Sequence, residues 1–319
     1  MRIDPSIAAL RGDPASQRRN QAALEAAGHE WASGPSASDA LRELVRYGDE
    51  ASLAECPALA GLLARIELAE PFANALVSSM ARALGACPLG HVPFRHQSAD
   101  GGAVLQIARA GRAVLSLVSY DPSDGEPAPR SVGFADGERH EICLAGHASY
   151  RRVQARGTGK AKVHLKMQKL ELCRGGVVSL TGRGETKIVD RVTRKLVLLR
   201  LARSAQRPAP SLEYRLSDGA LMHRAAGSCE ESRTELILAL LGSMGRGDAV
   251  PAMAKMARSG ADSLRWQALR QCLALDSETG FHALTAIAET ATDPLHRAAS
   301  DLRSALVARY PQLHAMEAR

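Results

Sequence analysis

The sequence predicts an α+β protein in which helical segments precede and follow a central β-rich region. Apolar residues recur at helical spacing from Ser38 to Ala86 and again from Ser228 to Leu313. Between about 92 and 226, short runs with β-type alternation are separated by turn signals such as Asp218-Gly219. About ten to twelve short strands without a long helix favour a sandwich or barrel.

These patterns divide the 319 residues into four parts. We expect a flexible arm over 1–35 with one short helix near Ser16–Trp31, helices over 36–87, a β-barrel over 88–227 and a helical region over 228–319. The second part is predicted to hold helices near 38–47, 57–67 and 71–86. Pro57 and Pro71 are expected to open the last two helices, because proline is tolerated in a first turn. Phe72, Leu76, Met80 and Leu84 share one face of the last helix, which predicts a core-facing surface.

An internal echo marks the C-terminal region. Two segments match at an offset of 31 residues, which is the difference between positions 293 and 262. The matched pairs are Asp262 and Asp293, Leu264 and Leu295, Trp266 and Arg297, and Ala268 and Ala299. The segment resembles HEAT-like repeats, which implies stacked helix pairs with a concave surface for a protein partner. An ordinary helical bundle is the alternative.

Charge and cysteine content limit which partners and which cellular compartment we expect. The net charge of +7, from 41 basic and 34 acidic residues, permits an anionic partner without requiring one. Six scattered cysteines without a C-x-x-C pair indicate a reducing compartment. The N-terminus lacks the apolar run of a signal peptide, and no stretch of about 18 apolar residues occurs. We therefore expect a cytoplasmic protein that makes no membrane contact.

A glycine pattern in the β-rich region suggests a family. Gly176, Gly182 and Gly184 are followed by Lys187 and Arg191. On these residues the segment resembles the second motif of the cupin superfamily, in which histidine stands at the position of Lys187 and asparagine at that of Arg191. The resemblance implies an antiparallel β-barrel, here flanked by N-terminal helices and a C-terminal helical repeat-like region.

The first cupin motif is only partly present. Glu141 and Gly146 match its glutamate and a following glycine, but the chain reads 135–137 as Ala-Asp-Gly where the family has its metal-binding H-x-H. A protonated lysine has no lone pair to donate, so Lys187 does not replace the fourth ligand. We therefore expect a cupin-like fold without a metal or other cofactor.

The cysteine-dioxygenase-like branch of the family also places helices before its barrel. The resemblance implies that Arg95 stands where that branch keeps a carboxylate-binding arginine. The branch's H-x-H is missing as well, because Arg130-Ser131-Val132 occupies its place. The resemblance thus supports the topology and not the chemistry.

The favoured interpretation is a non-catalytic ligand-sensing or scaffolding protein, with the question of enzymatic activity left open. Its pocket would bind an anionic or zwitterionic small molecule, and 228–319 would bind a protein partner. The candidate ligand-binding residues are Arg95, His140, Glu141 and Lys187. No catalytic residue is assigned.

Two alternatives remain. A divergent metal-dependent cupin oxygenase or isomerase would hold Fe, Mn or Ni with His91, His96, His140 and His147. Odd spacing in a strand places the members of each pair on opposite faces, which argues against one shared metal. Nucleic-acid binding through the basic strands over 151–203 is disfavoured, because aromatic stacking partners are scarce there. The row expected to carry it is Lys160, Lys162, His164 and Lys166.

Overall fold

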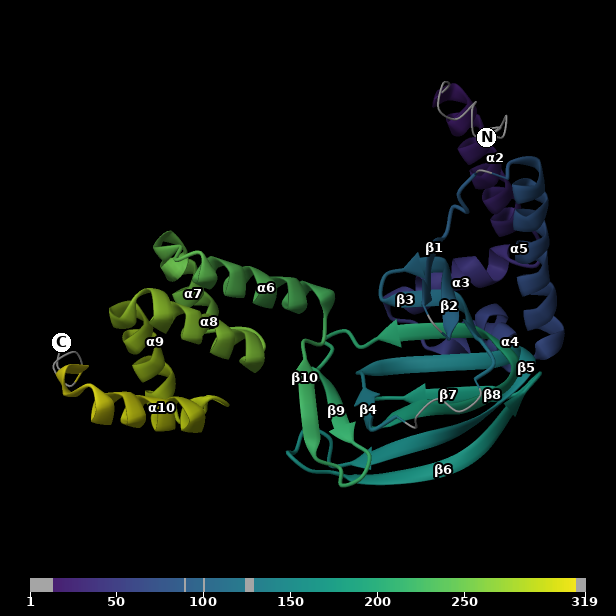
Figure 1. Ribbon diagram of the computed structural model, residues 1–319. Coiled ribbons are helices and arrows are strands. Elements are labelled where there is room, and N and C mark those ends of the chain that lie inside the picture. The colour runs from purple at the N-terminus through teal and green to yellow at the C-terminus, as the bar shows by residue number, and fades with distance from the viewer. Residues whose placement is uncertain (1–13, 89, 100, 124–128, 314–319) are drawn as a thin grey trace, which may run out of the picture. The chain divides into compact units, whose positions relative to one another are not determined.

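The computed structural model describes residues 14–88, 90–99, 101–123 and 129–313. Helices and antiparallel sheets build it, which confirms the α+β class (Figure 1). The chain divides into two compact units, Met1–Arg224 and Ala225–Arg319, and each is described by itself. Within the described ranges, every helix is too short or too polar to cross a membrane.

Helices cover one face of the large sheet in the first unit (Figure 1). They are α2 (Pro14–Ser33), α3 (Ser38–Asp49), η1 (Leu53–Glu55), α4 (Pro57–Ala64) and α5 (Ile66–Ala86). Phe72 and Leu76 on α5 are at most 1% exposed and share a core with Leu115 and Leu199 of the sheet. Met80 is buried as well, so three of the four residues predicted for the core face of α5 are in the core.

Two expectations for this region are wrong. The helix predicted near Ser16–Trp31 is confirmed as α2, but the segment 14–33 is helical throughout and is not a loose arm, because Leu24 and Trp31 are buried at helical spacing. Residues 1–13 of the expected arm lie outside the described residues. Pro71 does not open a helix, since α5 begins at Ile66 and passes through it. Burial of the apolar face on both sides of the proline offsets the one helical hydrogen bond that Pro71 does not make.

Seven strands form the large sheet. Its order is β1-β2-β3-β8-β5-β6, and β7 also pairs with β5. The strands are β1 (Arg95–Ala99), β2 (Gly102–Ala110), β3 (Ala113–Tyr120), β5 (Gly137–Arg156), β6 (His164–Cys173), β7 (Val177–Thr181) and β8 (Glu185–Ser204). All pairings are antiparallel.

The two 20-residue strands, β5 and β8, pair along their whole lengths and bend together. Register shifts interrupt the pairing between Cys143 and Ala148. Gly146 lies there with a φ of +94°, and a Cβ at this position would meet Lys195 O at 2.1 Å. Only glycine permits this backbone to approach so closely, and such irregularities bend a strand pair. The two halves of the pair can therefore face each other.

A smaller sheet has the order β10-β9-β4, with β4 (Ser131–Phe134), β9 (Ser211–Arg215) and β10 (Leu221–Ala225). Its Phe134 and Tyr214 pack with Val153 of β5. Among the described strands, the hydrogen-bonded order of the large sheet ends at β1 and at β6 and does not return on itself. The predicted closed barrel is therefore replaced by two open sheets, because β5 and β8 fold over as a bent pair.

The second unit is helical. It contains α6 (Cys229–Ser243), η2 (Gly247–Ala249), α7 (Val250–Met256), α8 (Asp262–Leu275), α9 (Ser277–Glu289), α10 (His296–Arg309) and η3 (Pro311–Leu313). Two residues of the sequence echo, Asp262 and Asp293, both bind the buried Arg265, while Ala268 and Ala299 are fully buried. The two aspartates thus share one arginine, and the HEAT-like repeat itself stays a prediction.

Candidate functional site

A buried carboxylate lies at the centre of the site. The Glu141 side chain is 1% exposed and accepts hydrogen bonds from two cations. Lys187 Nζ donates to its Oε2, and Arg200 Nε donates to its Oε1 at 2.6 Å. The Lys187 side chain is only 2% exposed. Arg200 also donates from Nη2 to the Tyr120 hydroxyl oxygen at 3.0 Å.

Strand bending brings these residues together. Glu141 pairs with Arg200 across β5 and β8, whereas Lys187 pairs with Arg152, eleven residues further along β5. Such a separation along a flat strand is about 36 Å. The Lys187–Glu141 contact therefore requires that the two halves of the β5–β8 pair face each other, with these side chains between them.

The cations keep the carboxylate charged. Burial by itself raises the pKa of Glu141, but the charges of Lys187 and Arg200 outweigh it and hold the pKa below its usual value. Burial lowers the pKa of Arg200, but the Glu141 carboxylate and the Tyr120 hydroxyl together outweigh this effect and raise the pKa above the ordinary arginine value. The pair is thus ionised at neutral pH.

Arg139 differs from the other two cations. It lies two residues before Glu141 on the same face of β5 and is half-buried. Its guanidinium makes no hydrogen bond or ion pair with any described residue. Burial, and then the positive charge of Arg200, lower the pKa of Arg139. The Arg139 guanidinium, with five donors, lines a cavity and can offer them to an anion that enters it.

A cavity of about 570 Å³ opens beside this cluster. Arg139, Lys187 and Arg200 line it together with the apolar side chains of Val104 and Val118. This volume lies within the range of about 300–1,000 Å³ that is typical of small-molecule pockets. The arrangement offers hydrogen-bond donors and positive charge on one side and apolar surface on another.

The structure brings together two of the four predicted ligand residues. Lys187 lines the cavity, and Glu141 lies behind it as the partner of the cations. His140 follows Arg139 on β5 and so points to the opposite face. Arg95 is exposed at the start of β1 and does not line the cavity. Lys187 is also not a free ligand group, because its ammonium is already paired with Glu141.

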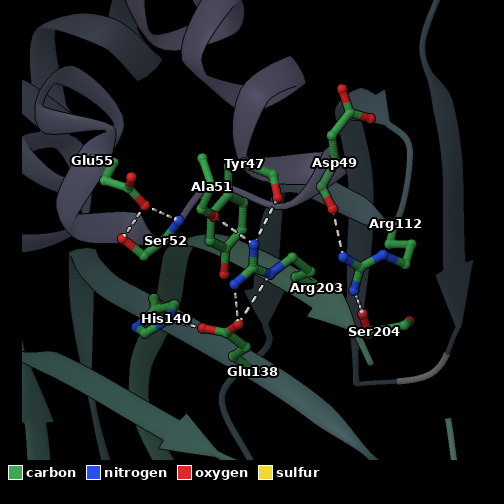
Figure 2. A network of polar contacts seen from close by, with 10 residues as sticks. All are labelled: Tyr47, Asp49, Ala51, Ser52, Glu55, Arg112, Glu138, His140, Arg203 and Ser204. Atoms are coloured by element: carbon green, nitrogen blue, oxygen red, sulfur yellow. Dashed lines mark hydrogen bonds and ion pairs between the residues drawn. The ribbon is translucent and has the colours of Figure 1, made fainter. Parts of the chain in front are cut away.

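His140 belongs instead to a polar network that joins the helices to the sheet (Figure 2). Its Nε2 lies 3.5 Å from Glu138 Oε2, and Glu138 accepts from the guanidinium of Arg203. Arg203 also donates to the carbonyl oxygens of Tyr47 and Ala51 at 2.8 and 2.7 Å. Its guanidinium carbon lies 3.9 Å from the centre of the Tyr47 ring. This network fixes α3 on β5 and β8.

The four histidines of the metal-dependent alternative do not converge. His140 and His147 lie seven residues apart on β5, about 23 Å along an extended strand. His147 contacts Thr193 and Glu171, while His96 lies on the exposed edge strand β1 and His91 precedes it. Within the part of the chain that the structure describes, no three side chains of His, Cys, Asp or Glu form a group that could hold a metal ion.

The basic strands present a solvated surface. Lys160, Lys162, His164 and Lys166 are all exposed, but only the last two lie on β6. Arg151 and Arg152 are neutralised by Asp190 and Glu185. The continuous positive row that nucleic-acid binding would use is therefore shorter than the sequence suggested.

Sequence reasoning missed Arg139 and Arg200. Arg200 is the one charged residue in the apolar run LVLLRLA, and a charge inside such a strand is a signal for a buried polar cluster. Arg139 shares the parity of Glu141, so it could have been placed beside that carboxylate in place of His140.

No family model matches the sequence, and no curated protein matches it. Solved structures do show likeness to part of the chain. The 7S globulin of Momordica charantia is 12% identical over 38% of this chain and 35% of that chain, with a TM-score of 0.27. A cupin superfamily protein from Desulfitobacterium hafniense is 16% identical over 34% of this chain and 83% of that one, with a TM-score of 0.24.

A seed globulin of pumpkin is 13% identical over 39% of this chain and 35% of that chain, with a TM-score of 0.27. The chain thus spans about a third of the length of the globulins that it matches. The structures with local likeness include cupin superfamily proteins, and at these TM-scores the likeness carries no argument about function.

Proposed function

We propose that this chain is a non-catalytic binding protein whose first unit holds a small anionic molecule in a metal-free, cupin-like pocket. The observation that carries the proposal is Arg139, a half-buried guanidinium without a hydrogen-bond partner among the described residues, on the wall of a 570 Å³ cavity. Lys187 and Arg200 add positive charge beside it.

The geometry favours binding over catalysis. Lys187 and Arg200 are both hydrogen-bonded to Glu141, which fixes their positive charges at the wall of the cavity. Arginine keeps its proton throughout the physiological range, and its planar donors suit carboxylate and phosphate groups. An anion that enters the cavity would supply the acceptors that Arg139 lacks.

Titration calorimetry with acetate, succinate and phosphate tests this proposal. Arg139→Met should weaken the binding of any anion that the wild type binds by at least about tenfold, since a charge-assisted hydrogen bond contributes about 1.5–3 kcal/mol. Arg109→Met is the matched control, because Arg109 is an exposed arginine on strand β2. Equal affinities of the wild type and the Arg139 variant would overturn the proposal.

We further propose that the helical region binds a protein partner. Four large apolar side chains of α6 and its C-terminal end are 55–69% exposed, namely Leu236, Ile237, Leu240 and Met244. They recur at helical spacing, and such a stripe favours a protein contact. The double substitution Leu236→Glu and Leu240→Glu should abolish co-purification of a partner without changing helicity. Unchanged co-purification would contradict this surface.

A further inference from the structure

The charges around the cavity do not balance. Among the described residues of this cluster, Arg139, Lys187 and Arg200 contribute +3 and Glu141 contributes −1, which leaves a net charge of +2. The two carboxylates among the described lining residues have cations of their own, since Asp190 pairs with Arg151 at 2.7 Å and Asp121 pairs with Lys195 at 2.9 Å. In the described part of the lining, the excess positive charge therefore lies on the three-cation cluster.

The excess charge is also concentrated. Lys187 and Arg200 both contact the one carboxylate of Glu141, and Arg139 lies on the same strand face two residues away. A monocarboxylate would leave one positive charge without compensation in a partly desolvated place. A dicarboxylate of extended shape would carry its second charge away from the cluster.

We propose that the natural ligand is a phosphate monoester, whose two negative charges lie on one tetrahedral group that matches this cluster. The inference rests on the proposed function and names its ligand class. A phosphate group offers three acceptor oxygens, which suit the free donors of Arg139 and the remaining protons of Lys187 and Arg200. Val104, Val118 and Val189 line the same cavity and provide apolar surface for the organic part.

The affinities of two ligands of the same shape and different charge test whether the charge of the ligand determines binding. Phenyl phosphate and phenyl sulfate both end in a tetrahedral group, but at pH 8 the phosphate carries two charges and the sulfate one. With the full chain at pH 8, phenyl phosphate should bind at least tenfold more tightly, equivalent to about 1.4 kcal/mol. At pH 5 the two ligands should bind with similar affinity, because the second phosphate ionisation has a pKa of about 6 and the phosphate then carries mainly one charge.

The pH dependence should come from the ligand. The charged and titratable groups around the cluster, among the described residues, are Arg139, Glu141 and Tyr150 from β5, Lys187, Asp190 and Arg200 from β8, Tyr120 from β3 and Asp121 after it. The pKa of Glu141 lies below its usual value, and no histidine is among the described residues of the lining. Phenyl sulfate affinity should therefore stay flat from pH 5 to pH 8.

The outcomes separate the two proposals. Equal affinity for phenyl phosphate and phenyl sulfate at pH 8 would overturn the phosphate inference and leave anion binding intact. Failure of phosphate, succinate and both phenyl esters to bind would overturn the proposed function itself. Arg139→Met should lose at least tenfold in phenyl phosphate affinity, whereas Arg109→Met should bind it like the wild type. Wild-type affinity in the Arg139 variant would place the ligand elsewhere and refute the inference.

Discussion

Arg139→Met and Lys187→Met each remove one positive charge from the same cavity, yet we expect opposite effects on the stability of the ligand-free protein. The Lys187 side chain is 2% exposed and bonded to Glu141, which is 1% exposed. Arg139 is half-buried beside Arg200 and makes no hydrogen bond with a described residue. Lys187→Met breaks a buried ion pair, whereas Arg139→Met removes a half-buried charge that makes no ion pair with a described residue.

The magnitudes follow from the partners that remain. Breaking a buried pair by removal of one member costs about 3–5 kcal/mol. Arg200 can still donate to Glu141 after Lys187→Met, as it does now at 2.6 Å, so we expect a loss of about 3 kcal/mol, at the low end of that range. Arg139→Met relieves repulsion and desolvation, and we expect a gain of about 1 kcal/mol, as is common when a binding site gives up a charged group.

The assay uses the first unit's own tryptophan. The chain has two tryptophans, and Trp31 lies in the core of the first unit against Phe72. In a Trp266→Phe background, fluorescence during guanidinium unfolding reports this unit alone, and linear extrapolation gives its free energy of unfolding. If both variants lose stability by similar amounts, Arg139 is a structural residue and the argument for an unsatisfied anion site fails.

Three further predictions concern the network, acid and the unit boundary. Arg203→Lys should lower stability by about 2–3 kcal/mol, because lysine cannot bind Glu138 and two carbonyls while stacking on Tyr47. The control Arg109→Lys, at an exposed arginine of β2, should lower it by less than about 1 kcal/mol, and equal losses in denaturant unfolding would refute the role of the network. The pKa of Glu141 is lower in the folded protein than in the unfolded chain, so the ionised carboxylate contributes fully to the free energy of unfolding above the unfolded pKa of about 4.3. This contribution disappears as the pH falls through the folded pKa. Glu141→Gln should therefore flatten the dependence of stability on pH below about 4, and an unchanged slope would contradict this. A fragment of residues 1–224 should unfold cooperatively with a β-rich circular dichroism spectrum, and aggregation of the fragment would show that the two units depend on each other.

The local elements could be predicted from the sequence, and the closure of the sheet could not. Helical spacing located α3, α4 and most of α5, because each buries a stripe of apolar residues against the sheet. The start of α5 was predicted at Pro71 because proline favours the first turn of a helix. That preference takes no account of the burial of the residues around Pro71. The large sheet stays open because β5 and β8 bend at Gly146, and whether long strands close or fold over depends on register, which short-range patterns do not specify.

The candidate site shows the same division between local and long-range information. The family resemblance placed Glu141 and Lys187 in one pocket, and the bent β5–β8 pair brings their side chains into contact. Treating His140 as their neighbour ignored the alternation of a strand, which sends adjacent residues to opposite faces. Arg139 lies two residues from Glu141 and therefore on the same face of β5, and the register of β5 against β8 places Arg200 directly opposite Glu141. Among the described residues, three cations surround one carboxylate, and the two surplus charges are the observation on which the proposed anion site rests.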